Sequence, residues 1–390
     1  GIMTLVLIKF IFNFRASFKD ISEGQKGTSR FTTMEEIKEQ YKSVYEVETE
    51  EERKQGGYSG KGGVIISRDK DILFIDDSPT NNMTIGTSRS GKGELFVFPT
   101  IDLYSRAEEK ASLIVNDPKA ELYGASKEIL EARGYRVEVL NLINPLNSMS
   151  YNPLQLVIDA YEKKDYSTAQ SLCKTLTHML YYKPDTKDPF WQNSAMSLVN
   201  ALILAVTEKC FEDCKIYYKK IDELKNSDNK SKGKLISNLE KEVEKIKSKI
   251  TLYTVANMLS ELGSKTDIKG NNELDKYFSN LPVESVAKMQ YATSNFSKGE
   301  ARGSIFSVAM SELNIFTMDE IAKLTSKNSI NLKDIGFKSE DNRPVALFMT
   351  VPDYDTSNHV IASIFVRQLY YVLAKEATFN IPAKCDREVI

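Results

Sequence analysis

Residues 83–94 read Met-Thr-Ile-Gly-Thr-Ser-Arg-Ser-Gly-Lys-Gly-Glu. Gly86, Gly91 and Lys92 are spaced as G-x-x-x-x-G-K, which is the frame of a phosphate-binding loop. Glycines let the backbone curl so that successive N–H groups point at one anion, and the lysine places a positive charge beside the β- and γ-phosphates. The frame predicts a nucleotide-binding loop formed by Gly86, Thr87, Ser88, Arg89, Ser90, Gly91, Lys92, Gly93 and Glu94.

The flanking segments help to decide between this loop and a glycine-rich surface turn. The apolar run 83–85 is expected to form a strand that leads into the loop. Residues 94–98 are expected to open a helix, which Pro99 would kink or shorten. Strand, loop and helix in this order are the context that the motif requires. The pattern alone also occurs by chance, so the surface turn stays open as the alternative.

The metal ligands of such a loop are not fixed by the sequence. The residue after the loop lysine is usually Ser or Thr, whose hydroxyl holds Mg²⁺, whereas this chain has Gly93. The ion would then be held by the hydroxyl groups of Thr87 or Ser90, by Asp117, or by water alone.

Composition limits the classes to which the chain can belong. It has 390 residues, of which 41% are hydrophobic and 27% are charged, as in an ordinary globular protein of two or three domains. A net charge of −2 argues against a protein that coats nucleic acid through bulk positive charge, but it permits a local basic lining. The four cysteines lack metal-ligand spacing, so we expect buried free thiols in a reducing cytosol.

The N-terminal segment is apolar from residue 2 to residue 14 and is followed by Arg15 and Lys19. It is shorter than the ~20 residues that span a bilayer. It also lacks the basic start and the small-residue cleavage site of a signal peptide. We interpret residues 1–20 as the cytoplasmic end of a truncated membrane anchor, with positive charge on the inner side. A buried N-terminal helix or strand is the alternative.

Strand and helix patterns alternate in two parts of the chain. Strands are predicted at residues 64–67, 71–75, 111–115, 135–140, 345–351 and 386–390, and helices at residues 33–44, 120–133 and 357–377. This alternation predicts an α/β fold with a parallel sheet and right-handed crossovers. Ligands of such sheets bind beyond the carboxyl ends of the strands, where Asp117 is found, so Asp117 is also predicted to bind the nucleotide.

Helical patterns replace strand patterns from about residue 153 to residue 314. Helices are predicted at residues 165–182, 189–210, 235–262 and 272–296. We expect an all-helical insertion domain at 153–314, between a first part of the nucleotide-binding domain at 21–152 and an incomplete second part at 315–390. The charged residues of 215–249 are interpreted as a solvated helical hairpin.

A set of motifs resembles a known family. Asn116-Asp-Pro-Lys-Ala-Glu-Leu-Tyr123 and Tyr151-Asn-Pro-Leu154 follow the loop in the order found in coupling-protein ATPases of conjugative type IV secretion systems, of the TraG/TraD type. Further matches are Lys26-Gly-Thr-Ser-Arg-Phe31, Asp188-Pro-Phe-Trp191 and Ser304-Ile-Phe-Ser307. Glycine commonly follows the loop lysine in this family. The Lys-, Asn- and Ile-rich composition is typical of a low-GC Gram-positive source.

The resemblance implies a RecA-like P-loop NTPase fold with a large all-α insertion. It also implies a membrane-anchored homo-hexamer at the cytoplasmic face of the cell membrane, which binds ATP and Mg²⁺. Such a protein recruits DNA and its relaxase as cargo and drives their transfer to the type IV secretion channel. The helical insertion would face the cargo.

The resemblance also implies a Walker B strand that ends in adjacent acidic residues. In the family order this strand should follow Val389-Ile390, so we expect the chain to be truncated before it. The alternative is that residues 345–351, followed by Pro352-Asp353, form the Walker B strand. A chain without these carboxylates would bind nucleotide but hydrolyse it poorly, because the metal and the attacking water lose their partners.

Two residues are predicted to be catalytic, Lys92 in the loop and Arg302. A motor of this class completes its site with an arginine from a neighbouring subunit. Arg302 lies in Lys298-Gly-Glu-Ala-Arg-Gly303, where the glycines would let it reach outward. Arg89 is the rival, acting within its own subunit, and a solvated arginine in a flexible turn is the third interpretation.

Other functions are compatible with the same patterns. One is a motor for DNA segregation or packaging that has no secretion partner. Another is a nucleotide-binding scaffold that does not hydrolyse ATP. The residues that flank this sequence in the full-length protein would separate these functions.

Overall fold

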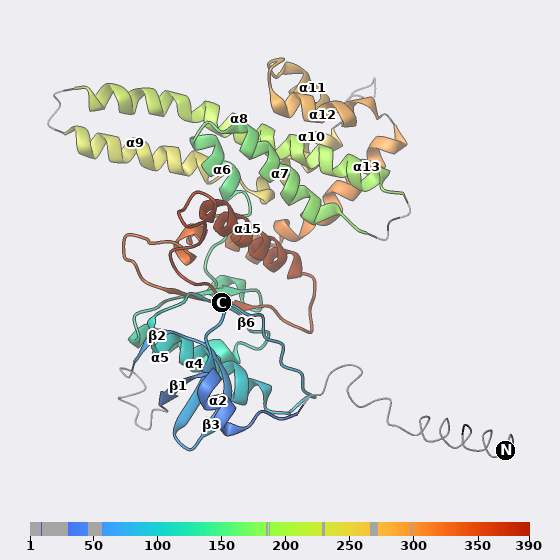
Figure 1. Ribbon diagram of the computed structural model, residues 1–390. Helices are drawn as coiled ribbons and strands as arrows, with labels where there is room; N and C mark the ends of the chain where they lie inside the picture. Colours follow the sequence, from blue (N-terminus) through green and yellow to red (C-terminus); the bar gives the residue numbers. More distant parts are fainter. Residues whose placement is uncertain are drawn as a thin grey trace. The chain divides into compact units, whose positions relative to one another are not determined.

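The protein is described by a computed structural model. It describes residues 9, 30–45, 57–184, 186, 188–227, 231–265, 272–297 and 299–390. Apart from residue 9, the predicted end of a membrane anchor at 1–20 lies outside these residues. The chain divides into two compact units, residues 1–48 with 62–103, and residues 49–61 with 104–390 (Figure 1). Each unit is described by itself.

The first unit contains an antiparallel sheet in the order β1-β4-β3. Its strands are β1 Lys42–Tyr45, β3 Val64–Asp69 and β4 Ile72–Asp76. The pairing of β3 with β4 confirms the two predicted paired strands at 64–67 and 71–75. The helix predicted at 33–44 is shorter, because α2 (Met34–Gln40) ends where the chain turns into β1.

The helix after the glycine loop is longer than predicted. It begins with a π-helical turn, η1 (Gly93–Val97), and continues as α4 (Phe98–Arg106). Proline in a helix removes one hydrogen bond and its ring clashes with the carbonyl four residues earlier. Here the wider turn, in which Phe98 N donates to Gly93 O, directly precedes Pro99 and changes the register. Of the two predicted effects of Pro99, a kink or a shorter helix, the shortening is wrong, because the helix continues to Arg106.

The second unit contains a parallel sheet in the order β6-β8-β7. Its strands are β6 Leu113–Asn116, β7 Arg136–Asn141 and β8 Val345–Thr350. All six residues of β8 are buried, as expected for the central strand of a parallel sheet. Val389 forms a parallel bridge with Ser112, so residues 388–390 extend along the free side of β6. The predicted mixed α/β class with a parallel sheet is confirmed.

The remaining elements of this unit are one strand pair and many helices. Strand β2 (Tyr58–Lys61) pairs in parallel with β5 (Ala107–Glu109). The α-helices are α5 Glu121–Ala132, α6 Gln155–Glu162, α7 Tyr166–Tyr181, α8 Phe190–Lys225, α9 Lys232–Lys247, α10 Leu252–Ser264, α11 Glu273–Asn280, α12 Val286–Phe296, α13 Glu300–Leu313, α14 Asp319–Leu324 and α15 His359–Ala377. The 3₁₀ turns are η2 Pro145–Asn147, η3 Asn314–Thr317 and η4 Leu332–Ile335.

The helices and the sheet of this unit share one hydrophobic core. Leu347 of β8, Phe365 of α15 and Leu202 of α8 belong to the same cluster of buried residues. The predicted boundaries at 153 and 315 therefore mark a change in secondary structure, but the packing continues across them. Within the described residues, α8 is the one helix long and apolar enough to cross a membrane, and 72% of its apolar window is buried inside the protein.

Candidate functional site

The glycine loop of the first unit curls back on itself. The φ angles of Arg89 and Gly91 are 63° and 81°, in the left-handed region. Ser90 N donates to Thr87 O at 3.2 Å. The ammonium group of Lys92 donates to the carbonyl oxygens of Gly86 and Thr87 at 2.7 and 2.8 Å. The charged end of the lysine thus lies beside the first residues of an exposed loop.

The space around the three loop glycines explains which of them the conformation requires. A Cβ atom at Gly86 would lie 2.4 Å from Ser90 Oγ and 3.2 Å from Lys92 Cγ. Gly91 has a positive φ, and a Cβ atom there would lie 3.2 Å from Leu95 Cδ1. No atom lies within 4 Å of a Cβ built at Gly93. The positive φ therefore favours glycine at Gly91, a side chain at Gly86 would require the Ser90 and Lys92 side chains to move, and Gly93 has room for a side chain.

The strand predicted at residues 83–85 is absent from the structure. Met83 and Ile85 lie in irregular chain, with 86% and 87% of their surfaces exposed. A strand needs a neighbour to pair its N–H and C=O groups, and no described strand pairs with this segment. The apolar pattern predicted a strand, but a pattern cannot supply the pairing partner.

Asp117 lies at the carboxyl end of β6, as predicted, and its side chain caps a helix. It is 1% exposed, and its Oδ2 accepts a hydrogen bond from Tyr123 N at 2.8 Å, in the first turn of α5. Its own N–H donates to Met349 O at 2.9 Å. One carboxylate oxygen is thus engaged at the helix start. Asp117 belongs to the second unit and the glycine loop to the first, so its predicted role toward the nucleotide stays a prediction.

A cavity of about 730 Å³ opens at the same end of the parallel sheet. Asn116 of β6 and Met349 of β8 line it, facing one side of α15. The residues that α15 contributes are His359, Ala362, Ser363, Val366, Arg367 and Tyr370. His359 is held by a 2.7 Å hydrogen bond between Nε2 and Pro352 O. The cavity lies where parallel sheets place their ligands.

The structure corrects the expected position of Arg302. The residue lies in the first turn of α13, is 8% exposed, and donates from NH1 to Asp275 Oδ2 at 2.5 Å. Its Nε donates to Ser297 O at 2.8 Å. The expectation that flanking glycines let Arg302 reach outward is wrong in this structure. A role in a neighbour's site stays a prediction, and it would require this ion pair to break.

The partner of Arg302 was not identified from the sequence. Asp275 also accepts a hydrogen bond from Tyr291 OH at 2.9 Å and forms a capping box with Asn272 at the start of α11. The carboxylate therefore joins α11, α12 and α13. The Asn272-x-x-Asp275 spacing is a helix-start signal that could have indicated part of this arrangement.

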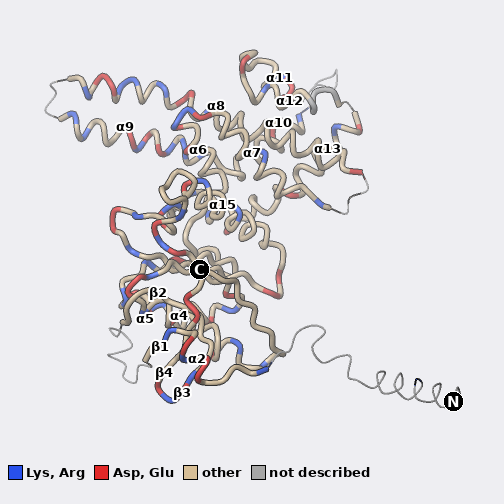
Figure 2. Tube along the Cα trace, viewed as in Figure 1, with Lys and Arg blue, Asp and Glu red and all other residues tan. Residues whose placement is uncertain are grey.

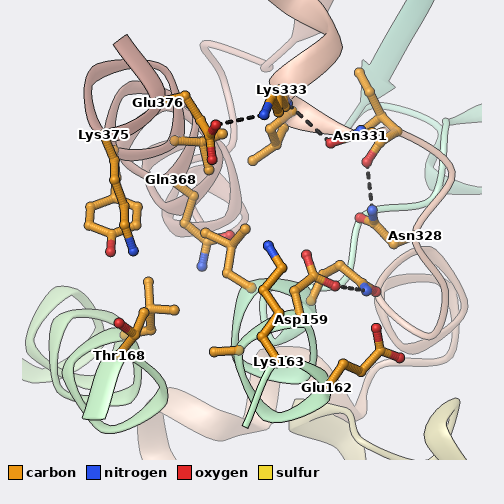
Figure 3. A pocket seen from close by; sticks show the side chains of 18 of the residues that line it. Asp159, Glu162, Lys163, Thr168, Asn328, Asn331, Lys333, Gln368, Lys375 and Glu376 are labelled. Carbon is orange, nitrogen blue, oxygen red and sulfur yellow. Dashed lines mark hydrogen bonds and ion pairs between the residues drawn. The ribbon is translucent and has the colours of Figure 1, made fainter. Parts of the chain in front are cut away.

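A polar pocket of about 570 Å³ lies between α6 and α7 on one side and η4 and α15 on the other (Figure 3). Its polar groups mostly bind one another: Lys333 pairs with Glu376 at 2.6 Å, and Gln155 donates to Asp159 at 2.8 Å. Burial raises the pKa of the Asp159 carboxyl. No sequence pattern indicated this pocket, because distant segments supply its walls.

The residues that could hold a metal ion are few. No group of three or more His, Cys, Asp or Glu side chains is arranged for a metal ion among the described residues. The four cysteines are free; Cys173, Cys210 and Cys214 are buried, as the sequence predicted, whereas Cys385 is only half-buried. The predicted hydroxyl ligands Thr87 and Ser90 lie in the glycine loop, and their role toward a metal ion stays a prediction.

Comparison with known proteins identifies the family. The model of the family described as Type IV secretory system Conjugative DNA transfer matches residues 30–384. No curated protein was found to match the chain. The match contains the glycine loop, the strands of all three sheets and the helical block. The chain therefore belongs to the family of type IV secretory system conjugative DNA transfer proteins.

Proposed function

We propose that the chain is an ATP-binding coupling protein of a conjugative type IV secretion system, of the TraG/TraD type. Membership of the DNA transfer family supports a role in type IV secretion. The observation that carries nucleotide binding is the position of Lys92, whose ammonium group is held by the Gly86 and Thr87 carbonyls of a curled loop. The fold would be RecA-like, with the helical block as its insertion.

The chemistry of the loop favours an anionic ligand. In the structure the Lys92 ammonium is bound by neutral carbonyl oxygens, and phosphate oxygens would bind it more strongly because they carry charge. The helix that begins at Gly93 follows the loop directly, so the positive end of its dipole lies at the loop. Mg²⁺ bound with ATP would neutralise phosphate charge, and the hydroxyl groups of Thr87 or Ser90 would be its side-chain ligands in the loop.

In the cell, the proposed function is ATP-driven transport. ATP hydrolysis would drive the transfer of DNA and its relaxase to the secretion channel. The protein would act as a homo-hexamer at the cytoplasmic face of the membrane, anchored through residues 1–20. Lys92 would contact the β- and γ-phosphates in each subunit.

The test is a nucleotide titration of Lys92→Ala. We expect the variant to lose measurable ATP binding while it keeps its fold, since a charged hydrogen bond of this kind contributes about 1.5–3 kcal/mol and the lysine makes more than one. Lys174→Ala, an exposed lysine on α7, is the matched control and should bind ATP normally. A folded Lys92→Ala protein with unchanged affinity for ATP would refute nucleotide binding at this loop.

A further inference from the structure

The helices α8 and α9 form a long hairpin that extends beyond the rest of the helical block (Figure 1). Its two helices pack on each other, and Ile221 of α8 and Val243 of α9 are buried, at 5% and 4% exposed. The large hydrophobic core includes Cys210 of α8, and Ile246 of α9 packs against it, whereas Ile221 and Val243 are not part of it. The outer part of the hairpin thus makes no contribution to the main core and presents its surface to solvent.

Charge is distributed unevenly along this hairpin. We define the hairpin tip as residues 216–227 and 231–235, and the hairpin root as residues 208–215 and 240–249. The tip has five lysines and two acidic residues, a net charge of +3, whereas the root has six lysines and six acidic residues, a net charge of zero. Figure 2 shows where these charges lie along the two helices. The basic end belongs to a chain whose overall charge is −2.

Ion pairing accentuates the difference between the tip and the root. In the root, Lys209 pairs with Asp213 at 2.6 Å, and Lys215 pairs with Glu212. Among the described residues, no ion pair involves a lysine of the tip. Lys232 donates to the Ser227 carbonyl at 3.2 Å, which leaves its charge unneutralised. The exposed tip lysines are Lys219, Lys220, Lys225, Lys232 and Lys234.

We propose that the hairpin tip is a contact surface for the phosphate backbone of DNA. The inference rests on the proposed function, because the family match to DNA transfer makes DNA the polyanion favoured over an anionic membrane. Lysines on mobile stems act as point charges, so they hold phosphates without reading bases. The contact would therefore be independent of sequence and would weaken with salt. Because the outer part of the hairpin lies apart from the main core, it can bind DNA without disturbing the fold.

The test uses the whole chain with five lysines replaced by glutamine in two matched ways. The tip variant changes Lys219, Lys220, Lys225, Lys232 and Lys234. The control changes the five exposed lysines of the root, Lys209, Lys215, Lys241, Lys245 and Lys249. Both remove five positive charges, and glutamine keeps nearly the same helix propensity. Binding to a labelled DNA oligonucleotide is measured between about 50 and 200 mM salt, the range over which phosphate binding is most salt-sensitive, with ATP binding measured in parallel.

We expect the tip variant to bind DNA at least about tenfold more weakly at low salt. Its salt slope should fall by about 0.7–0.9 for each phosphate that the tip no longer neutralises, whereas the root control should stay close to the unaltered chain. Equal losses in both variants, or an unaltered chain that binds no DNA, would overturn the inference. A tip variant that still binds DNA but no longer binds vesicles containing phosphatidylserine would also overturn the inference. ATP binding by the unaltered chain separately decides the proposed function.

Discussion

Arg302 and Asp275 form an ion pair that lies almost out of solvent, with 10% and 13% of their side chains exposed. Removing one partner of a buried pair leaves the other charge without compensation, at a cost of about 3–5 kcal/mol. We therefore expect Arg302→Ala to lower the free energy of unfolding by about 3 kcal/mol in urea denaturation. Lys183→Ala, which breaks an exposed pair with Glu312, is the control and should cost less than about 1 kcal/mol.

The alternative role of Arg302 makes a different prediction for the full-length hexamer. An arginine that completes a neighbour's site should let Arg302→Ala subunits mixed with Lys92→Ala subunits recover part of the ATPase activity. Such recovery, together with an Arg302→Ala protein as stable as the unaltered one, would contradict the structural role. If Arg302→Ala lowers the stability and the mixed hexamers recover no ATPase activity, the role of Arg302 is to form the ion pair with Asp275.

At the residue scale, the sequence predicted the conformations that are set by residues close together in the chain. The curl of the loop follows from local spacing, because Gly86 and Gly91 occupy the positions where a side chain would clash or where φ is positive. The environment of Arg302 was not predictable in the same way. Its partner Asp275 is 27 residues away, and only the packing of three helices brings the two together.

At the scale of elements, long uniform patterns predicted the fold well. The apolar run of β8 and the helix α15 lie where they were expected, because a buried parallel strand and a long amphipathic helix have strong signals. Helix ends were less predictable. The segment 235–262 splits into α9 and α10 because Thr251 caps a new helix, accepting from Thr254 N at 3.1 Å.

The outer part of the hairpin is predicted to be unnecessary for the stability of the rest of the protein. Replacing residues 216–245 by a short Gly-Ser turn removes Ile221 and Val243, which pack within the hairpin, and keeps Cys210 and Ile246, which pack on the main core. We expect the shortened protein to keep ATP binding and to melt within a few degrees of the unaltered chain. Differential scanning fluorimetry with and without ATP measures both.

A wider deletion provides the control for this prediction. Removing residues 208–251 also takes away Cys210, Ile246 and Ile250, all of which belong to the main core or pack against it. Ile250 O additionally accepts a hydrogen bond from Asn152 Nδ2 at 2.9 Å. This deletion should destabilise the helical block strongly. If the shorter deletion is equally damaging, the hairpin is part of the folding core.

At the scale of the whole molecule, the sequence predicted an all-helical insertion domain at 153–314, whereas the second unit has one continuous core. The boundary was drawn where strands give way to helices. The central part of α8, residues 198–206, is buried on every side, as is typical of a helix that forms the centre of a large protein. Secondary structure can be predicted from local patterns, but the surface on which such a helix packs comes only from the fold.

The continuous core predicts that the sheet and the helical block unfold together. Leu347 of β8 is fully buried in the shared core, and Leu→Ala changes at such sites cost about 2–5 kcal/mol. Trp191, the single tryptophan, packs on that core from the start of α8 and reports on the helical block. We expect Leu347→Ala to lower the urea midpoint of Trp191 fluorescence, and Val366→Ala, on an exposed part of α15, to leave it nearly unchanged. A fluorescence midpoint that stays fixed in Leu347→Ala, while hydrogen exchange in β6, β7 and β8 becomes faster, would show that the helical block unfolds as a module of its own.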